Sequence, residues 1–267
     1  MLDEIQGLKS MDASPFDVYL QPHSDDICFS LGAFAHKHHC GILLTVLPIS
    51  AFMPNPGAAL HSSTPPESPS PSSEWITNSR KNEDIAFAAA CKLKCSFLEM
   101  PCASFLGHAP FDLAWINQNQ RRIAAPLLDA LVMAAADRPS RTRPWLFCPT
   151  GIGSHVDHVA IHRLINENFN LLSQYYRLGF YEDLHYASDA AARSKGIGIL
   201  QEEMRYRGLR RHAFPFGERV AQKLSLIKIY SSQFPSFPQS IQQFTPAADV
   251  PHEPHEAIWS CERMPIE

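Results

Sequence analysis

Short apolar runs alternate with longer segments of helical periodicity along most of the chain. We predict buried strands at residues 17–21, 42–49, 96–100, 145–149 and 177–181, because short continuous apolar runs are typical of a sheet covered on both faces. Helical patterns occupy residues 29–39, 77–94, 114–136, 159–172, 200–211 and 217–233. Pro126 is expected to kink or divide the third of these helices. The alternation predicts an α/β fold, Rossmann-like and doubly wound, with a mostly parallel sheet and helices on both faces.

Two stretches depart from this alternation. Residues 52–76 are rich in proline and serine and predict a long irregular insertion loop, and α/β patterning resumes on both sides of it. Residues 235–267 predict a coil-rich extension with one late strand. The chain of 267 residues is therefore expected to form a single domain over residues 1–267.

Composition narrows the class of protein. A net charge of -4 argues against a general nucleic-acid binder, which would usually carry a basic face. The seven cysteines are odd in number and contain no C-x-x-C pair, which suits a reduced compartment better than a disulfide framework. The amino terminus lacks the basic and apolar parts of a signal peptide, and no apolar run approaches the ~18 residues that span a bilayer. These features predict a soluble, cytoplasmic protein without a transmembrane segment.

Metal-capable side chains are concentrated in two short clusters that each follow a predicted strand. The first runs from Gln21 to Asp26 (QPHSDD), and the second from Gly153 to His158 (GSHVDH). In doubly wound sheets, ligands bind outside the carboxyl ends of the strands at the point where strand order reverses. We therefore expect the two clusters, about 130 residues apart, to meet at one edge of the sheet.

Together the clusters can provide a three-ligand divalent metal site. His23 and Asp26 are three residues apart, as are His155 and His158, so each pair can share one face of a helical turn. Two imidazoles and a carboxylate, from His23, Asp26 and His158, leave a fourth position for water, which is typical of catalytic zinc sites. A divalent ion lowers the pKa of such a water from about 15.7 towards about 7.

The remaining polar side chains of the clusters suit hydrolysis of an amide. Asp25 cannot easily point the same way as Asp26 and is free to act as general base. His155 can stabilise the oxyanion of a tetrahedral intermediate and then protonate the leaving amine. Asp157 can orient an imidazole.

The Pro22–Asp26 stretch (PHSDD) resembles the P-H-x-D-D motif of the PIG-L/LmbE-like family, which comprises the N-acetylglucosaminyl-phosphatidylinositol de-N-acetylases and related zinc amidohydrolases. The His155–His158 stretch resembles its H-x-D-H motif, and Arg80–Glu83 its R-x-x-E segment. Weaker similarity extends through residues 181–183 and 223–234, so that the resemblance covers about residues 17–234.

This resemblance implies a Rossmann-like fold and removal of acetyl groups from amino-sugar-type small molecules. Carried over residue by residue, it implies metal ligation by His23, Asp26 and His158, with Asp25 as base and His155 at the oxyanion. Arg80 matches a position that contacts substrate in some relatives.

The chain also departs from the family pattern. Ile27 stands where many members have Glu, Ser24 where many have Pro, and Cys102 where many have Asp. These changes leave the metal chemistry intact but weaken the assignment of an amino sugar, so a different amide substrate is plausible.

Three alternatives stay open at this point. Two histidines and one carboxylate also form the iron site of non-haem oxygenases, so Fe²⁺ is possible in place of Zn²⁺. A non-catalytic Rossmann-like binding module that has kept the motif is a second alternative. Finally, the basic cluster of Arg205, Arg207, Arg210, Arg211 and His212 could either bind an anionic group or form a solvated helix face.

Overall fold

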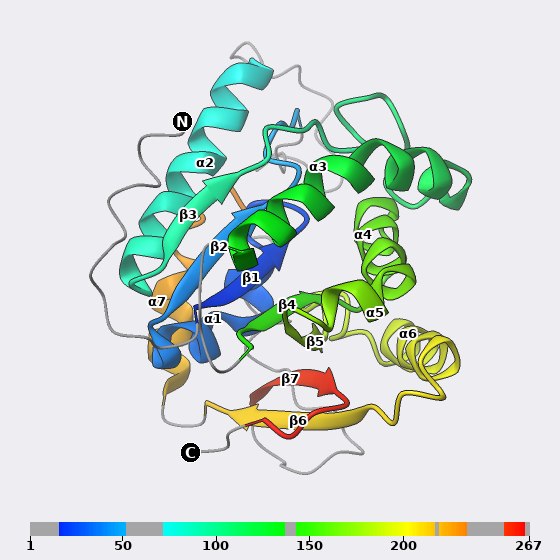
Figure 1. The fold of residues 1–267 in the computed structure, drawn as a ribbon. Coiled ribbons are helices and arrows are strands. Elements are labelled where there is room, and N and C mark those ends of the chain that lie inside the picture. The colour runs from blue at the N-terminus through cyan, green and yellow to red at the C-terminus, as the bar shows by residue number, and fades with distance from the viewer. Residues whose placement is uncertain (1–15, 52–71, 137–142, 217–218, 234–253, 265–267) are drawn as a thin grey trace.

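A single seven-stranded sheet forms the centre of the protein (Figure 1). The computed structural model describes residues 16–51, 72–136, 143–216, 219–233 and 254–264. The strands, in chain order, are β1 (Asp17–Gln21), β2 (Gly41–Thr45), β3 (Lys94–Phe97), β4 (Trp145–Pro149), β5 (Arg177–Tyr181), β6 (Arg210–Pro215) and β7 (His255–Ser260). They lie in the order β3-β2-β1-β4-β5-β7-β6. The first five are parallel, while β7 is antiparallel to both β5 and β6.

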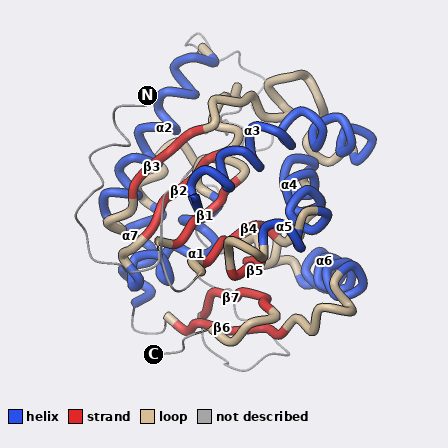
Figure 2. Tube along the Cα trace, viewed as in Figure 1, coloured by secondary structure: helices blue, strands red, loops and turns tan. Residues whose placement is uncertain are grey.

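Helices cover both faces of the sheet (Figures 1 and 2). They are α1 (Asp26–His38), α2 (Ser73–Ala90), α3 (Ile116–Ala136), α4 (Val156–Glu167), α5 (Phe169–Leu172), α6 (Ala190–Glu203) and α7 (Val220–Ile227). Helices α1, α2 and α7 pack on one face, and α3, α4, α5 and α6 on the other. The predicted doubly wound α/β fold is therefore confirmed. Among the described helices, none is both long and apolar enough to cross a membrane.

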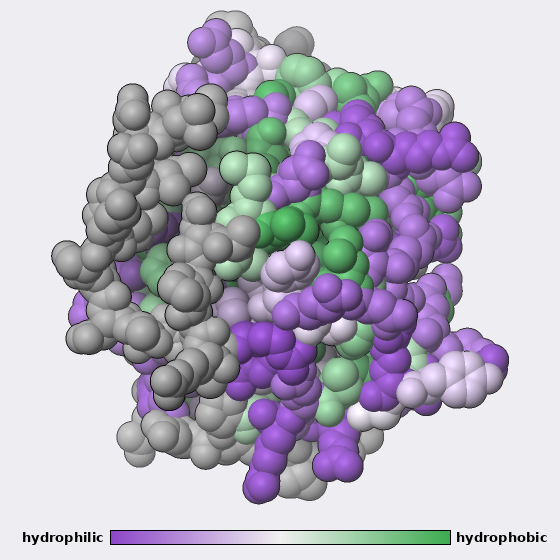
Figure 3. All heavy atoms as spheres, viewed as in Figure 1, coloured by the Kyte–Doolittle hydropathy of each residue, from purple (hydrophilic) through white to green (hydrophobic). Residues whose placement is uncertain are grey.

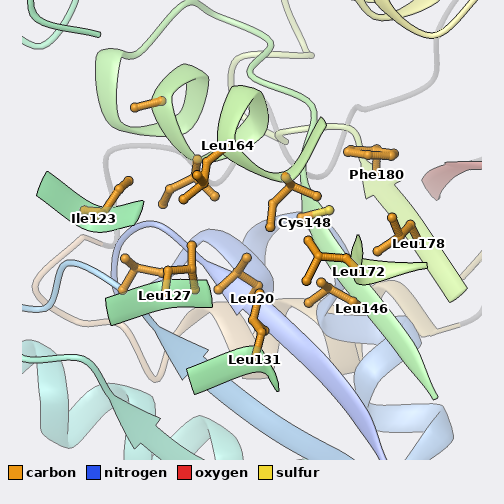
Figure 4. Close-up of a cluster of buried hydrophobic side chains, with 14 of the residues drawn as sticks. Leu20, Ile123, Leu127, Leu131, Leu146, Cys148, Leu164, Leu172, Leu178 and Phe180 are labelled. Carbon is orange, nitrogen blue, oxygen red and sulfur yellow. The ribbon is translucent and has the colours of Figure 1, made fainter. Parts of the chain in front are cut away.

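Each face of the sheet buries its own apolar cluster, because the parallel strands point side chains alternately to both sides. One cluster joins α3, α4 and α5 to the sheet, and Figure 4 shows it: Leu20, Ile123, Leu127, Leu131, Leu146, Cys148, Leu164, Leu172, Leu178 and Phe180. The other lies under α1, α2 and α7 around Tyr19, Phe147 and Tyr181. On the face in Figure 3, hydrophilic side chains gather over α4 and α6, the sides turned away from the sheet.

The strands β1, β4 and β5 have the predicted bounds, whereas several helix predictions need correction. The predicted helix at 200–211 is wrong from residue 204 onward, because α6 ends at Glu203 and Arg210–Pro215 form β6. The backbone of Arg211 pairs with Trp259, a contact between distant residues that local periodicity cannot reveal. The predicted helix at 217–233 is helical as α7 only over Val220–Ile227. The predicted late strand is β7.

Other boundaries differ for local reasons. Pro126 does not divide α3, which continues through it. The predicted helix at 159–172 begins earlier, at Val156, and is interrupted at Asn168 between α4 and α5. The predicted 52–76 loop lies outside the described residues over 52–71, and its last residues belong to α2, whose first turn is capped by the Ser72 hydroxyl. Of the predicted 235–267 extension, only residues 254–264 are described.

Strand order fixes where a ligand can bind. The chain runs outward from β1 to β2 and β3 on one side, and from β4 to β5 on the other, so the order reverses between β1 and β4. The carboxyl ends of those two adjacent strands form the switch point at which doubly wound sheets bind ligands.

Candidate metal centre

Three loops meet at the switch point. His23, Asp25 and Asp26 follow β1, and the residues from His155 to His158 follow β4 at the start of α4. Asp183 follows β5, the next strand along. The two sequence clusters therefore lie side by side, as their positions after predicted strands indicated.

His23, Asp26 and His158 form a compact triangle of donor atoms. His158 Nε2 lies 3.3 Å from His23 Nδ1 and 3.4 Å from Asp26 Oδ1, and His23 Nδ1 lies 3.6 Å from Asp26 Oδ2. The backbone N–H of His23 donates to Asp26 Oδ2 at 2.8 Å and so orients this carboxylate. Four-coordinate zinc with bonds of about 2.0 Å places neighbouring donors about 3.3 Å apart. The three contacts are close to this spacing, with Asp26 meeting the two imidazoles through different oxygens.

A carboxylate orients each of the two imidazoles from its far side. Asp157 Oδ2 lies 2.9 Å from His23 Nε2, and Asp183 Oδ1 lies 2.7 Å from His158 Nδ1. When both of these ring nitrogens donate to the carboxylates, the two nitrogens that face each other present lone pairs. Two lone pairs 3.3 Å apart repel each other unless a cation lies between them, so the donor set fits a divalent ion.

The charge state of His158 reflects the same arrangement. Burial alone would lower the pKa of His158, but the charge of Asp26 and the hydrogen bond to Asp183 together raise it to about 9. The carboxylates around the ring therefore favour positive charge at this point, whether a proton or a metal ion carries it.

His155 stands beside the triangle and could be a further ligand. Ligand nitrogens of His23, His155 and His158 all lie within 4.8 Å of one another. The oxygens of Asp26 lie 3.4 and 3.6 Å from nitrogens of His158 and His23, so both Asp26 and His155 are within reach of an ion held by these two histidines. His155 also caps α4, because its Nδ1 accepts a hydrogen bond from the Asp157 backbone N–H at 3.3 Å. With Nδ1 accepting, the proton of neutral His155 is on Nε2. Burial and the neighbouring His23 hold the pKa of His155 well below its usual value.

Asp25 has an unusual backbone and an unusual charge environment. Its φ is 118°, in the left-handed region that Asp adopts only occasionally, and it precedes the first turn of α1. Burial and the adjacent Asp26 raise the pKa of Asp25 well above its ordinary value, while the charge of Arg80 opposes the shift. Arg80 is itself buried on α2. Arg80 is thus close enough for its charge to act on Asp25.

Several residues of the site were not identified from the sequence. Asp183, which holds His158, is the clearest, and its signal was available: a carboxylate directly after a parallel strand of the same sheet. Its second oxygen accepts from the Thr150 hydroxyl at 2.6 Å and the Ile152 backbone N–H at 3.0 Å, so the carboxylate is fixed in position. Asn119 likewise donates to Asp157 at 3.2 Å, a contact between α3 and α4 that had no sequence signal.

Aromatic rings close the site on the β5 side. The Tyr186 ring packs edge-on against His158 at 5.8 Å between centroids and lies 3.8 Å from the His185 ring, tilted by 42° to it. Gly153 makes this possible, because a Cβ there would lie 2.4 Å from the Tyr186 ring and the glycine has a φ of +89°. The glycine that begins the second cluster therefore provides space for the Tyr186 ring.

Three arginines of the basic cluster have partners within the protein. Arg211 donates to Glu182 at 2.7 Å, and Arg205 to Glu202 at 2.8 Å. Arg207 lies over the Phe169 ring at 3.9 Å. Since Arg210 and Arg211 lie in β6, the predicted solvated helix face does not exist over these residues.

Comparisons with known proteins bear on the fold. No family model and no curated protein matches the sequence. Among solved structures, the A40926 pseudoaglycone deacetylase Dbv21 is 19% identical with a TM-score of 0.59, over 93% of this chain and 97% of its own. The zinc-inhibited form of the teicoplanin deacetylase Orf2 is 16% identical with a TM-score of 0.60. The likeness covers 91% of this chain and 96% of the Orf2 chain. The conserved protein TT1542 from Thermus thermophilus is 17% identical with a TM-score of 0.51. The likeness covers 92% of this chain and 94% of the TT1542 chain.

These likenesses extend over nearly the whole chain. They show that this chain shares its fold with these structures, two of which are deacetylases. At such low identity a shared fold does not by itself transfer an activity, which has to be argued from the site.

Proposed function

We propose that this protein is a divalent-metal-dependent de-N-acylase. Its substrate would be an N-acetyl or similar N-acyl amide on an amino-sugar-containing or related small molecule. The observation that carries the proposal is the triangle of His23, Asp26 and His158, with a carboxylate behind each imidazole. The deacetylase fold of the similar structures supports the same reaction class.

Zn²⁺ is the proposed ion, with Fe²⁺ as the alternative, held by His23, Asp26 and His158. Two nitrogens and one oxygen suit either ion. When bound, the ion supplies Lewis acidity, which polarises a carbonyl and makes a water more acidic. The teicoplanin deacetylase Orf2 has a zinc-inhibited form, so activity should be measured at defined metal-to-protein ratios.

The chain's own residues supply the proton transfers. Asp25 would accept a proton from the attacking water. His155 has its Nε2–H available, since Nδ1 is engaged by the backbone, and would donate a hydrogen bond from it to the developing oxyanion. Because the lowered pKa of His155 keeps its ring neutral, the proton for the leaving amine would come from Asp25, which takes it from the water. Asp157 and Asp183 would fix the two ligating rings. Arg80 would balance the charge of Asp25 and contact the substrate. Water and amide would yield a carboxylic acid and an amine.

The cytoplasm stays the expected location. All seven cysteines are free thiols, which is in keeping with a reduced compartment. A small N-acylated molecule is the expected partner, and the net charge of -4 gives no support to nucleic-acid binding.

Replacing the proposed base tests the reaction. Asp25→Asn keeps the shape of the side chain, and Asn tolerates a positive φ, so the backbone at φ 118° should persist. We expect the variant to retain its metal and to lose about 10²- to 10⁴-fold in turnover, the usual contribution of a general base. Release of amine from a panel of N-acetylated sugars and amino acids measures this.

Glu99→Gln is the matched control, because Glu99 also has a positive φ, of 54°, and forms an exposed pair with Lys81. It should leave turnover unchanged. If Asp25→Asn keeps its rate within about tenfold of the wild type, Asp25 is not the base. Oxygen-dependent turnover without amine release would instead favour the iron oxygenase.

A further inference from the structure

Exposed apolar side chains gather on one loop beside the proposed site. Between β3 and α3, Phe105, Leu106, Phe111 and Leu113 are all exposed, and Phe111 most of all, at 58%. We call these four residues the apolar rim. Single exposed apolar residues are common, but four within nine positions are not, and apolar patches of this kind mark binding surfaces.

Hydrogen bonds hold the loop in one conformation. The backbone N–H of His108 donates to Ala103 O at 3.0 Å, and that of Asp112 to Ala109 O at 3.1 Å. The His108 ring stacks flat on Trp115 at 3.8 Å between centroids. The apolar rim is therefore held on ordered backbone.

The same loop is anchored to the metal centre at both ends. Near its start, the Ala103 N–H donates to Asp157 Oδ2 at 2.9 Å, the oxygen that also contacts His23. Near its end, Pro110 O accepts from the Val156 N–H at 2.7 Å, in the first turn of α4. The position of the apolar rim is thus fixed relative to the metal ligands.

Phe111 connects the apolar rim to the reacting groups. Its ring lies edge-on to His155 at 5.7 Å between centroids and to Tyr186 at 6.2 Å. Both separations fall within the range of favourable aromatic pairs. Phe111 therefore contacts both His155 and Tyr186, and Tyr186 in turn packs on His158, so aromatic rings connect the site with the apolar rim.

We infer that the apolar rim binds an apolar substituent of the substrate next to the scissile amide, with Phe111 as the specificity-determining residue. The inference rests on the proposed function and deepens it. A free N-acetylated sugar exposes little that would gain from this surface, whereas an alkyl or aryl group would be removed from water by it. The substrate class is accordingly an N-acylated amine that carries such a group.

The apolar group can belong to either side of the amide. A longer acyl chain would place it on the acid product, and an apolar aglycone on the amine product. Two substrates separate these sources: N-hexanoylglucosamine and hexyl N-acetylglucosaminide, each compared with N-acetylglucosamine.

Phe111→Ser tests the inference through a selectivity ratio. We expect the wild type to favour one of the hexyl-bearing substrates over N-acetylglucosamine by about tenfold or more in kcat/KM, and Phe111→Ser to reduce that ratio at least about fivefold. The ratio cancels any loss of rate that the variant shows on all substrates. Met133→Ser is the matched control, since Met133 on α3 is 57% exposed outside the apolar rim, and its ratio should equal that of the wild type.

Two results would overturn the inference: a wild type without preference for either hexyl substrate, or a preference that survives in Phe111→Ser. Calorimetry with hexyl N-acetylglucosaminide separates this failure from that of the proposed function. If the wild type hydrolyses none of the three substrates yet binds the hexyl compound more tightly than Phe111→Ser does, the apolar rim is supported and the de-N-acylase proposal is not.

Discussion

At the scale of the residue, the carboxylates behind the two imidazoles decide how well the site can hold an ion. Asp157 and Asp183 each contact the ring nitrogen that faces away from the triangle. Such partners fix the ring orientation and raise the basicity of the ligating nitrogen. Asp157 followed from the sequence because it lies inside the second cluster. Asp183 was not identified: the sequence places it directly after a predicted strand, but its contact with His158 depends on β5 lying next to β4.

Asp183→Asn should weaken metal binding. The amide keeps the size of the side chain but not its charge, so His158 becomes a poorer ligand, and we expect the metal Kd to rise about 10- to 100-fold. Competition with a chromophoric chelator measures the Kd. Glu203→Gln is the control, because Glu203 contacts His162 one turn further along α4 at 3.0 Å and should have no effect. An unchanged Kd in Asp183→Asn would show that Asp183 does not strengthen the ligation by His158.

At the scale of the element, α1 owes its shape to a buried ion pair. Leu31 is non-helical, with φ −132° and ψ 20°, and it interrupts the helix that begins at Asp26. Lys223 of α7 donates to the carbonyls of Cys28 and Phe29, each at 2.8 Å. Glu256 of β7 accepts from the Ala33 and Phe34 N–H groups at 2.9 and 2.7 Å.

The Lys223–Glu256 pair therefore satisfies the backbone groups on both sides of the interruption. Because these backbone groups have partners, the first turn of α1 can point in a different direction from the rest of the helix, which packs on the sheet. Asp25 and Asp26 lie at that first turn, so the ion pair helps to fix the backbone that carries them.

Lys223→Met should be strongly destabilising. It leaves the fully buried Glu256 without its cation, which typically costs about 3–5 kcal/mol of unfolding free energy, and Glu256→Gln in the same chain should restore much of the loss. Urea unfolding measures both. Lys81→Met, which breaks the exposed pair with Glu99, should cost less than about 1 kcal/mol. A similarly small cost for Lys223→Met would show that the pair does not stabilise the kink.

The elements also show where sequence reasoning succeeds. Strands β1, β4 and β5 were located from continuous apolar runs, because both faces of those strands are buried. Strand β6 was missed because it lies at the edge of the sheet, is only partly buried, and pairs with β7 about 45 residues later. The interruption in α1 was missed because the residues that stabilise it lie near the other end of the chain.

At the scale of the whole molecule, the topology brings the site together. Reversal of strand order between β1 and β4 places residues 23–26 and 155–158 at one edge, and the loop that carries the apolar rim is tied to the same point through Asp157. The convergence was predictable because it depends only on strand order and on cluster positions after strands. The apolar rim was not, because exposure of Phe111 depends on how the loop packs.

Metal content of His158→Ala tests the central claim most directly. We expect the wild type to hold about one equivalent of a divalent ion, as three-ligand catalytic sites do. His158→Ala should hold sharply less, because one of the three ligands is lost. His162→Gln on the same helix should keep the wild-type content, since His162 contacts Pro149 and Glu203 instead. If His158→Ala retains a stoichiometric ion, His158 is not a ligand and the proposed metal centre is wrong.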